Sequence, residues 1–167
     1  MRKGVFQLMV RPRPNRGKGY AVELVFKITL SSKDKLLLEQ IKNYFEVGRL
    51  LTQGSSISYC VKSLNELQVI INHFDNYPLI SNKWSDYQLF KEVFELRQQK
   101  KHLNSEGLNK IVSIKAVSNK GWSDKLRALF PQIVPALRPT VKSQIIPDPN
   151  WVSGFVEGDG SFYVKII

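Results

Sequence analysis

Apolar and polar residues alternate in two stretches near the start of the chain, residues 4–11 and 20–30. One face of both stretches carries only bulky apolar side chains, those of Phe6, Leu8, Val10, Val22, Leu24, Phe26 and Ile28. An alternation of period two predicts half-buried strands. The segment between them, RPRPNRGKG, contains prolines and glycines that exclude a helix, so the two stretches are predicted to form a long hairpin.

Helical patterns and two further strands follow. Ser32 is expected to cap a helix whose buried stripe is Leu37, Ile41, Tyr44 and Phe45, and Gly48 is expected to end it. Residues 48–53 and 56–63 are predicted strands around a turn at 54–55. Further helices are expected at residues 65–79, 83–101, 105–117 and 121–131. Core positions of these helices are expected at Leu67, Ile70, Ile71, Phe74, Trp84, Tyr87, Phe90 and Phe94. This order predicts an α+β fold with four antiparallel strands and helices on one face of the sheet only.

Residues 131–150 contain five prolines and no periodicity, which is typical of an extended linker. A short helix pattern and a strand pattern come after it. Residues 160–166 match residues 4–10 in their glycine, their phenylalanine and their alternation. The chain is therefore expected to hold a first repeat (1–130), a linker (131–150) and the start of a second repeat (151–167).

The charge balance narrows the choice of partners. Lys and Arg number 25 against 14 Asp and Glu, which gives a formal net charge of +11. A net positive charge of this size attracts polyanions, so nucleic acid is the first partner to consider and an anionic membrane surface is the second. No apolar run is long enough to cross a membrane. Cys60 is the only cysteine, which excludes a disulfide framework and a thiolate zinc site.

Residues 152–160 (VSGFVEGDG) combine two glycines with acids near the end of a helix pattern. Gly154 and Gly158 lie on one helix face, where each costs about 1 kcal/mol relative to alanine, so close approach of another helix would explain them. Asp159 falls at the helix C-terminus, where the macrodipole disfavours a carboxylate unless a cation is bound. Two such helices side by side would pair carboxylates that suit Mg²⁺. A glycine-rich helix end with solvated acids is the open alternative.

Residues 151–164 (WVSGFVEGDGSFYV) resemble the LAGLIDADG signature of homing endonucleases and the strand that follows it. Residues 19–35, 62–90, 100–116 and 146–162 also resemble single-chain, two-repeat members encoded in fungal organellar introns. The resemblance covers nearly the whole chain. It implies αββαββα repeats whose antiparallel strands form a saddle over double-stranded DNA.

The resemblance also implies an activity. Members cut both DNA strands at a long intron-insertion target, with Mg²⁺ or another divalent metal held by the last acid of each motif. That acid is Asp159 here, whereas Glu157 lies inside the helix and is not expected to bind the metal. A mitochondrial location and, for an intact two-repeat protein, a monomer are expected.

The chain departs from the family pattern at both ends. An intact member would carry a first motif before Gly4, where this sequence has only residues 1–3, and the second repeat stops at Ile167. One carboxylate cannot form a paired site, so this chain alone is expected to cut DNA negligibly. A truncated reading frame, a split exon and a shortened gene model are all open explanations.

The alternation also predicts a DNA-reading face opposite the helices. Its members are Gln7, Met9, Arg11, Glu23, Lys27, Thr29, Arg49, Gln53, Ser58, Cys60 and Lys62, with Tyr163 and Lys165 expected in the strand of the second repeat. A strand ribbon fits the major groove, where Arg and Lys read guanine and Gln reads adenine. Arg13, Arg16 and Lys18 in the hairpin loop are expected to hold phosphate.

Several alternatives remain open. The resemblance gives Lys27 a second candidate role, stabilising phosphate charge near the cleavage centre. A generic polar sheet surface is the alternative to the DNA-reading face. The alternatives to an endonuclease are a maturase that binds intron RNA without cutting DNA, and an inactive remnant.

Overall fold

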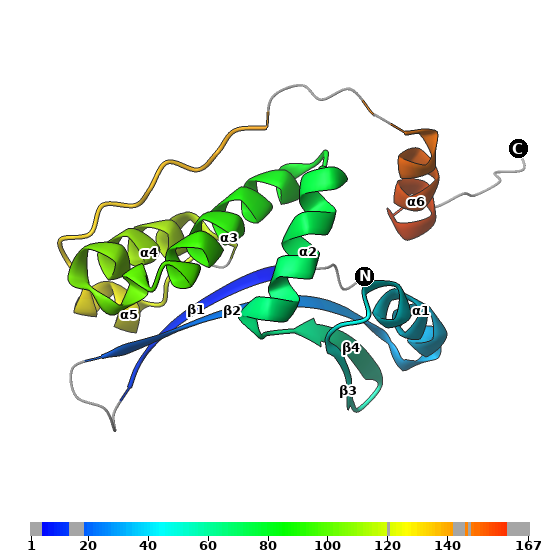
Figure 1. Ribbon diagram of the computed structural model, residues 1–167, viewed down its shortest axis with the longest axis horizontal. Coiled ribbons are helices and arrows are strands. Elements are labelled where there is room, and N and C mark those ends of the chain that lie inside the picture. The colour runs from blue at the N-terminus through cyan, green and yellow to red at the C-terminus, as the bar shows by residue number, and fades with distance from the viewer. Residues whose placement is uncertain (1–4, 14–18, 120, 142–145, 147, 160–167) are drawn as a thin grey trace, which may run out of the picture.

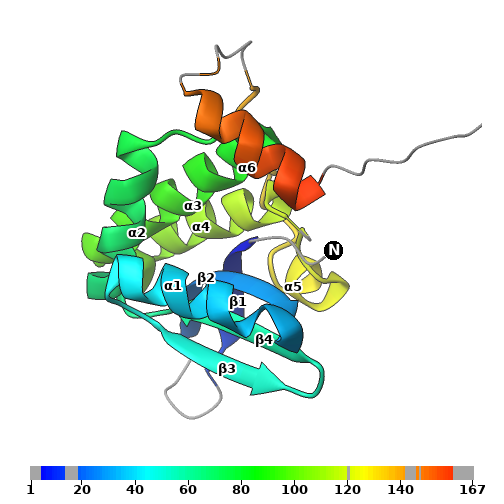
Figure 2. The same ribbon diagram turned by 90° about the vertical axis from the view of Figure 1, so that its right-hand side faces the viewer.

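The computed structural model describes residues 5–13, 19–119, 121–141, 146 and 148–159, and it has the predicted α+β architecture. The strands are β1 (Val5–Pro12), β2 (Tyr20–Ser31), β3 (Arg49–Gln53) and β4 (Ser56–Val61). They form one antiparallel sheet in the order β1-β2-β4-β3. Helices α1 (Lys35–Phe45), α2 (Leu64–Asn76), α3 (Asn82–Gln98) and α4 (Ser105–Val117) lie on one side of it (Figures 1 and 2).

The register of the sheet confirms the predicted faces. Phe6 lies opposite Phe26, Leu8 opposite Leu24, and Phe26 opposite Val61 on the other side. Leu24 and Phe26 are 1% and 4% exposed, whereas Glu23 is exposed and Lys27 half-buried. The apolar side chains therefore face the helices, as the alternation requires.

An aromatic cluster joins the sheet to the helices. The ring of Phe6 lies 5.3 Å from Phe26, 5.5 Å from Phe74, 5.5 Å from Tyr87 and 5.2 Å from Phe90, between ring centroids. Such pairs add about 0.5–1.5 kcal/mol each beyond their buried area. Because the cluster holds β1 and β2 to α2 and α3, it fixes the orientation of the sheet's opposite face.

The start of α1 differs from the prediction. Ser31, not Ser32, supplies the cap, because its side chain accepts a hydrogen bond from the backbone N–H of Lys33. A 3₁₀ turn, η1 (Ser32–Asp34), follows, and the α-helix begins only at Lys35. The α-helix therefore begins two residues later than a cap at Ser32 predicts.

The buried stripe and the end of α1 also differ. Leu38 is fully buried, whereas Leu37 and Tyr44 are 50% and 66% exposed, so two members of the predicted stripe were wrong. The helix ends at Phe45 because Glu46 takes a left-handed conformation (φ 56°). Gly48 (φ 78°) then turns the chain into β3 instead of ending the helix.

The later helices follow the predictions closely. Helix α4 has the predicted bounds, α5 (Asp124–Leu129) lies within the predicted segment, and α3 ends three residues before the expected Lys101. A second 3₁₀ turn, η2 (Lys101–Leu103), joins α3 to α4. Trp84 is only half-buried, in contrast to the expectation for the core. No helix among the described residues has the length and apolar character needed to cross a membrane.

Candidate nucleic-acid interface

The face of the sheet opposite the helices, here called the polar face, is made of cross-strand rows. Its members on the four strands include Gln7, Met9, Arg11, Glu23, Val25, Lys27, Thr29, Arg49, Leu51, Gln53, Ser58 and Cys60. Helices α1 to α4 lie on the other side (Figures 1 and 2). Directly opposite residues on neighbouring strands have Cβ atoms about 4.5–5.5 Å apart, so the rows place sequence-distant side chains together.

One row places two cations around the only cysteine. Lys27 lies opposite Cys60 on one side, and Arg49 lies opposite Cys60 on the other. Burial raises the pKa of the Cys60 thiol, against the opposing effect of the positive charges of Lys27, Lys62 and Arg49. The thiol is therefore neutral near pH 7, consistent with a small sheet residue and not with a nucleophile.

The neighbouring row is built from hydroxyl groups. Thr29 Oγ1 and Ser58 Oγ lie 2.9 Å apart, and Leu51 completes the row on β3. Ser58 and Cys60 are 6% and 3% exposed. Both side chains are therefore nearly buried in the sheet, in contrast to the exposure that contact with DNA would require.

The remaining members of the face are accessible to different degrees. Arg11, Glu23, Arg49, Gln53 and Lys62, which directly follows β4, are exposed. Gln7, Met9, Lys27 and Thr29 are half-buried, and Val25 is 3% exposed although it lies on the same face. The polar face thus carries exposed cations, Arg11, Arg49 and Lys62, around the nearly buried side chains of Ser58 and Cys60.

A hollow of about 290 Å³ lies beside Cys60, lined by Gly48, Arg49, Cys60, Lys62, Ser63 and Glu66. Ser63 caps α2, because its Oγ accepts from the backbone N–H of Glu66 at 3.3 Å, and the same Oγ donates to the Glu66 carboxylate at 2.8 Å. The backbone N–H of Gly48 also donates to Glu66 at 3.3 Å. The hydrogen bond from Ser63, foremost, lowers the pKa of Glu66, so this acid stays ionised and committed to the cap. The cations at the rim remain available to a ligand.

Only part of the predicted phosphate-binding loop can be placed. Arg13 is exposed where the hairpin loop begins, and its backbone N–H donates to the carbonyl of Gly19 at 2.9 Å. Arg16 and Lys18 lie outside the described residues, as do Tyr163 and Lys165. Their proposed DNA contacts stay predictions.

A cationic group near the hairpin was not found from the sequence. Arg97, near the end of α3, is half-buried, and burial together with the charge of Arg13 lowers its pKa while Glu23 opposes this. Burial, and then Arg97 and Arg13, lower the pKa of His102. His102 is therefore neutral near pH 7, and it is half-buried.

The predicted motif lies in α6 (Pro149–Asp159), of which Asp159 is the last residue. A Cβ at Gly154 would have no neighbour within 4 Å, so no described segment packs on that part of the helix. The described residues include no group of three or more His, Cys, Asp or Glu side chains that could hold a metal ion. By themselves they do not form a divalent-metal site.

Comparison with known proteins gives concordant matches. A family model described as LAGLIDADG endonuclease matches residues 3–94. "Probable intron-encoded endonuclease 3" of Neurospora crassa is 36% identical over 168 residues, which cover 98% of this chain and 32% of that protein. "Probable intron-encoded endonuclease 2" of the same organism is 32% identical, over 98% of this chain and 39% of that protein. The chain thus spans about a third of the length of these relatives.

Solved structures agree with the sequence matches. I-SmaMI bound to an uncleaved DNA target in the presence of calcium ions superposes with a TM-score of 0.92 and 45% identity, covering 96% of this chain and 56% of that chain. I-GzeII in complex with its DNA target gives a TM-score of 0.87 and 37% identity, over 93% of this chain and 54% of that chain.

Proposed function

Because this chain belongs to the LAGLIDADG endonuclease family of DNA-cleaving hydrolases, we propose that it binds double-stranded DNA through the polar face, as part of an intron-encoded homing endonuclease. The observation that carries the proposal is the row of Lys27 and Arg49 with Lys62 beside it, on a face that helices α1 to α4 leave uncovered. A ribbon of antiparallel strands fits the major groove, and cations neutralise the phosphates on either side.

The accessible side chains divide into two groups by their expected contacts. Arg11 and Arg49 are exposed and can donate two hydrogen bonds to guanine, while the half-buried Gln7 can do so to adenine. Glu23 can accept from cytosine. Arg13 at the hairpin loop is proposed to contact phosphate, which fixes the register of the protein on the duplex.

We propose that Asp159 supplies one carboxylate to a divalent-metal site and that Lys27 stabilises phosphate charge. The support for Asp159 is its place at the end of a glycine-containing helix, where a bound cation would offset the unfavourable macrodipole. Mg²⁺ is the expected metal, since it binds carboxylate oxygens. Cleavage needs at least one further acid, so the proposed cleavage activity belongs to a whole endonuclease of which this chain is a part. The related proteins named above are much longer than this chain.

An organellar location is proposed from relatives. A 50.9 kDa protein of Podospora anserina, whose name places it in ND4 intron 1, is 41% identical over 104 residues, 60% of this chain and 23% of that protein. That name supports an intron-encoded, mitochondrial origin.

The binding proposal is tested by fluorescence anisotropy with a labelled DNA duplex over a series of salt concentrations. Arg49→Gln combined with Lys62→Gln should weaken binding and lower the log–log salt slope by about 0.9 for each phosphate that is no longer neutralised. Lys125→Gln, which removes an exposed cation from α5, is the matched control and should leave both quantities unchanged. Unchanged affinity and slope in the double variant would refute the proposal. Tighter binding to an intron RNA than to duplex DNA would favour a maturase.

A further inference from the structure

Residues 130–139, here called the strap, are fastened to the helices. The backbone N–H of Ala136 donates to the carbonyl of Ser113 in α4 at 3.0 Å, and that of Ile133 donates to Phe130 at 3.2 Å. Phe130, Ile133 and Ala136 all pack against the hydrophobic core. This part of the predicted linker is extended, but it belongs to the folded body.

The strap ends in a hydrogen-bonded clasp. Arg138 Nη2 donates to Asp86 Oδ1 of α3 at 2.7 Å, and Arg138 Nη1 donates to the carbonyl of Val117, the last residue of α4, at 2.7 Å. Asp86 is only 9% exposed, and Lys83 lies 3.7 Å from its other oxygen. A buried carboxylate needs such partners, and a cation is favoured at a helix C-terminus. One guanidinium group therefore joins two helices to the strap.

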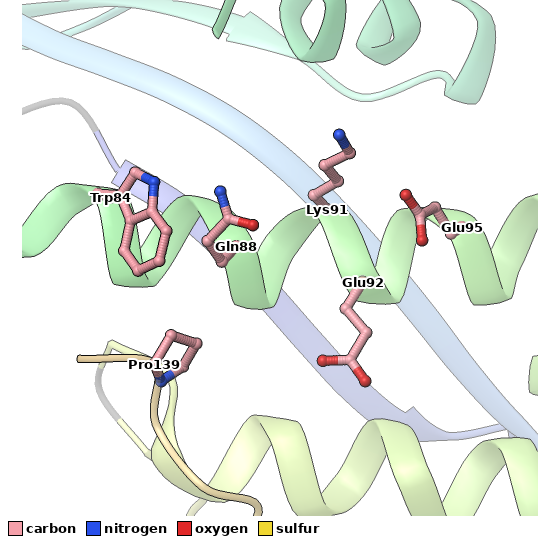
Figure 3. Close-up of a pocket in the computed structure, with 6 residues that line it drawn as sticks. All are labelled: Trp84, Gln88, Lys91, Glu92, Glu95 and Pro139. Carbon is pink, nitrogen blue, oxygen red and sulfur yellow. The ribbon is translucent and has the colours of Figure 1, made fainter. Parts of the chain in front are cut away.

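The residue after the clasp keeps the chain extended. Pro139 cannot lie in the interior of a helix without breaking it, and it biases Arg138 towards an extended backbone. Figure 3 shows Pro139 facing the α3 row that includes Trp84 and Gln88, across a groove of about 420 Å³. The groove follows α3, so the strap has a defined course along that helix.

We infer that the Arg138–Asp86 clasp makes the strap a positioning device for α6, the helix that carries Asp159. This inference rests on the proposed function of Asp159. Helices α5 and α6 lie at opposite ends of the molecule in Figure 1, and the strap covers much of the span between them. Arg138 is thus a positioning residue for cleavage.

The effect of the clasp on α6 follows from tether length. With the clasp closed, only residues 140–148 connect the body to α6, which starts at Pro149. At about 3.3–3.6 Å per residue, these nine residues reach about 30 Å. With the clasp open, the hydrogen bond of Ala136 still holds the strap to α4, so the tether becomes residues 137–148 and is about a third longer. Effective concentration falls roughly as the −3/2 power of tether length, so the clasp raises that of α6 about 1.5-fold.

The test measures the position of α6 directly in the full chain. Spin labels are placed at Asn109→Cys on α4 and Val152→Cys on α6, both exposed sites, in a Cys60→Ser background. Double electron–electron resonance should give a narrower distance distribution in this parent than in Arg138→Gln. Arg127→Gln, an exposed arginine of α5, is the matched control and should retain the parent width.

A second variant of Arg138 covers the case in which Arg138→Gln does not fold. Should Arg138→Gln fail to fold, Arg138→Lys retains one charged contact to Asp86 and should give an intermediate width. Equal widths in the parent and in the folded Arg138 variants would overturn the inference, whatever their thermal stability.

Cleavage assays in a whole endonuclease separate the two proposals. Arg138→Gln should lower kcat about 1.5-fold and leave KM for DNA unchanged, because the polar face is intact. Absence of cleavage in every variant, Arg127→Gln and the parent included, would refute the proposed function while the distance measurement still tests the clasp.

Discussion

Gly48→Ala tests the junction between α1 and the polar face. Gly48 has φ +78°, a left-handed conformation that a side chain disfavours. A Cβ there would lie 2.8 Å from the carbonyl oxygen of Cys60, 2.8 Å from Cγ2 of Val61 and 2.9 Å from Cε2 of Tyr59. All three distances are shorter than real Cβ contacts, and one neighbour is backbone, so the sheet itself has to shift.

The magnitude has two parts. The left-handed conformation costs a non-glycine residue about 1–2 kcal/mol. Overpacking of a filled site adds about 1–3 kcal/mol. Tyr59 cannot move aside easily, because its ring is fully buried and its hydroxyl donates to the carbonyl of Val47 at 3.0 Å. Gly48→Ala is therefore expected to lower the free energy of unfolding by about 2–5 kcal/mol.

Gly54→Ala is the matched control. Gly54 also has a left-handed backbone, φ +54°, but a Cβ there would meet nothing within 4 Å. Gly54→Ala should therefore lower the free energy of unfolding only by the cost of the left-handed backbone, about 1–2 kcal/mol. The difference between the two variants, about 1–3 kcal/mol, isolates the contacts with the strand β4 and its Tyr59.

The assay is urea unfolding followed by tryptophan fluorescence, with the midpoint and the slope compared among the parent and the two variants. An unchanged slope shows that the midpoint reports stability alone. If Gly48→Ala and Gly54→Ala are destabilised equally, the reasoning from close contacts is refuted, and the conformation of the backbone alone explains both effects.

Two other substitutions probe buried polar groups. Tyr87→Phe removes a hydroxyl that donates to Asp75 at 2.7 Å, and it should cost about 1–3 kcal/mol in thermal or urea unfolding; unaltered stability would contradict that cost. Burial lowers the pKa of His73, so the unfolded chain takes up a proton more readily, and stability should fall as the pH drops below about 6.5. In urea unfolding at pH 7 and pH 5, His73→Phe should reduce this loss; His102, with a pKa shifted the same way, should leave a remainder. An identical loss in parent and variant would exclude His73 as a source.

The strands were predictable because a one-residue error in register would expose an entire apolar face. The buried face of α1 was not predictable, for a local reason. Three successive leucines, Leu36, Leu37 and Leu38, allow two apolar stripes of similar quality along α1. Only packing on the sheet selects Leu38, which is fully buried, while Leu36 and Leu37 are 67% and 50% exposed. Helical periodicity alone contains no information on that choice.

The candidate site was predicted in outline but not in depth. Alternation placed Cys60 on the correct face, yet its neighbours there, Lys27 and Arg49, are distant in sequence and adjacent only through strand pairing. The same limit applies to the strap. Its prolines predict extended chain, whereas the partner of Arg138 is Asp86, 52 residues earlier. Accessibility and long-range ion pairs depend on neighbours that one segment cannot specify.

Under the proposed function, the division of the sheet into an apolar face and a polar face bears on how readily such a protein could acquire a new DNA target. Exposed positions at the strand ends, such as Arg11 and Gln53, can be exchanged without disturbing the core, and effects at distant sites add. The centre behaves differently, because Lys27, Cys60 and Arg49 share one row and any enlargement of Cys60 displaces both cations. Retargeting should therefore proceed position by position along the periphery, whereas the middle of the interface must be redesigned as a unit.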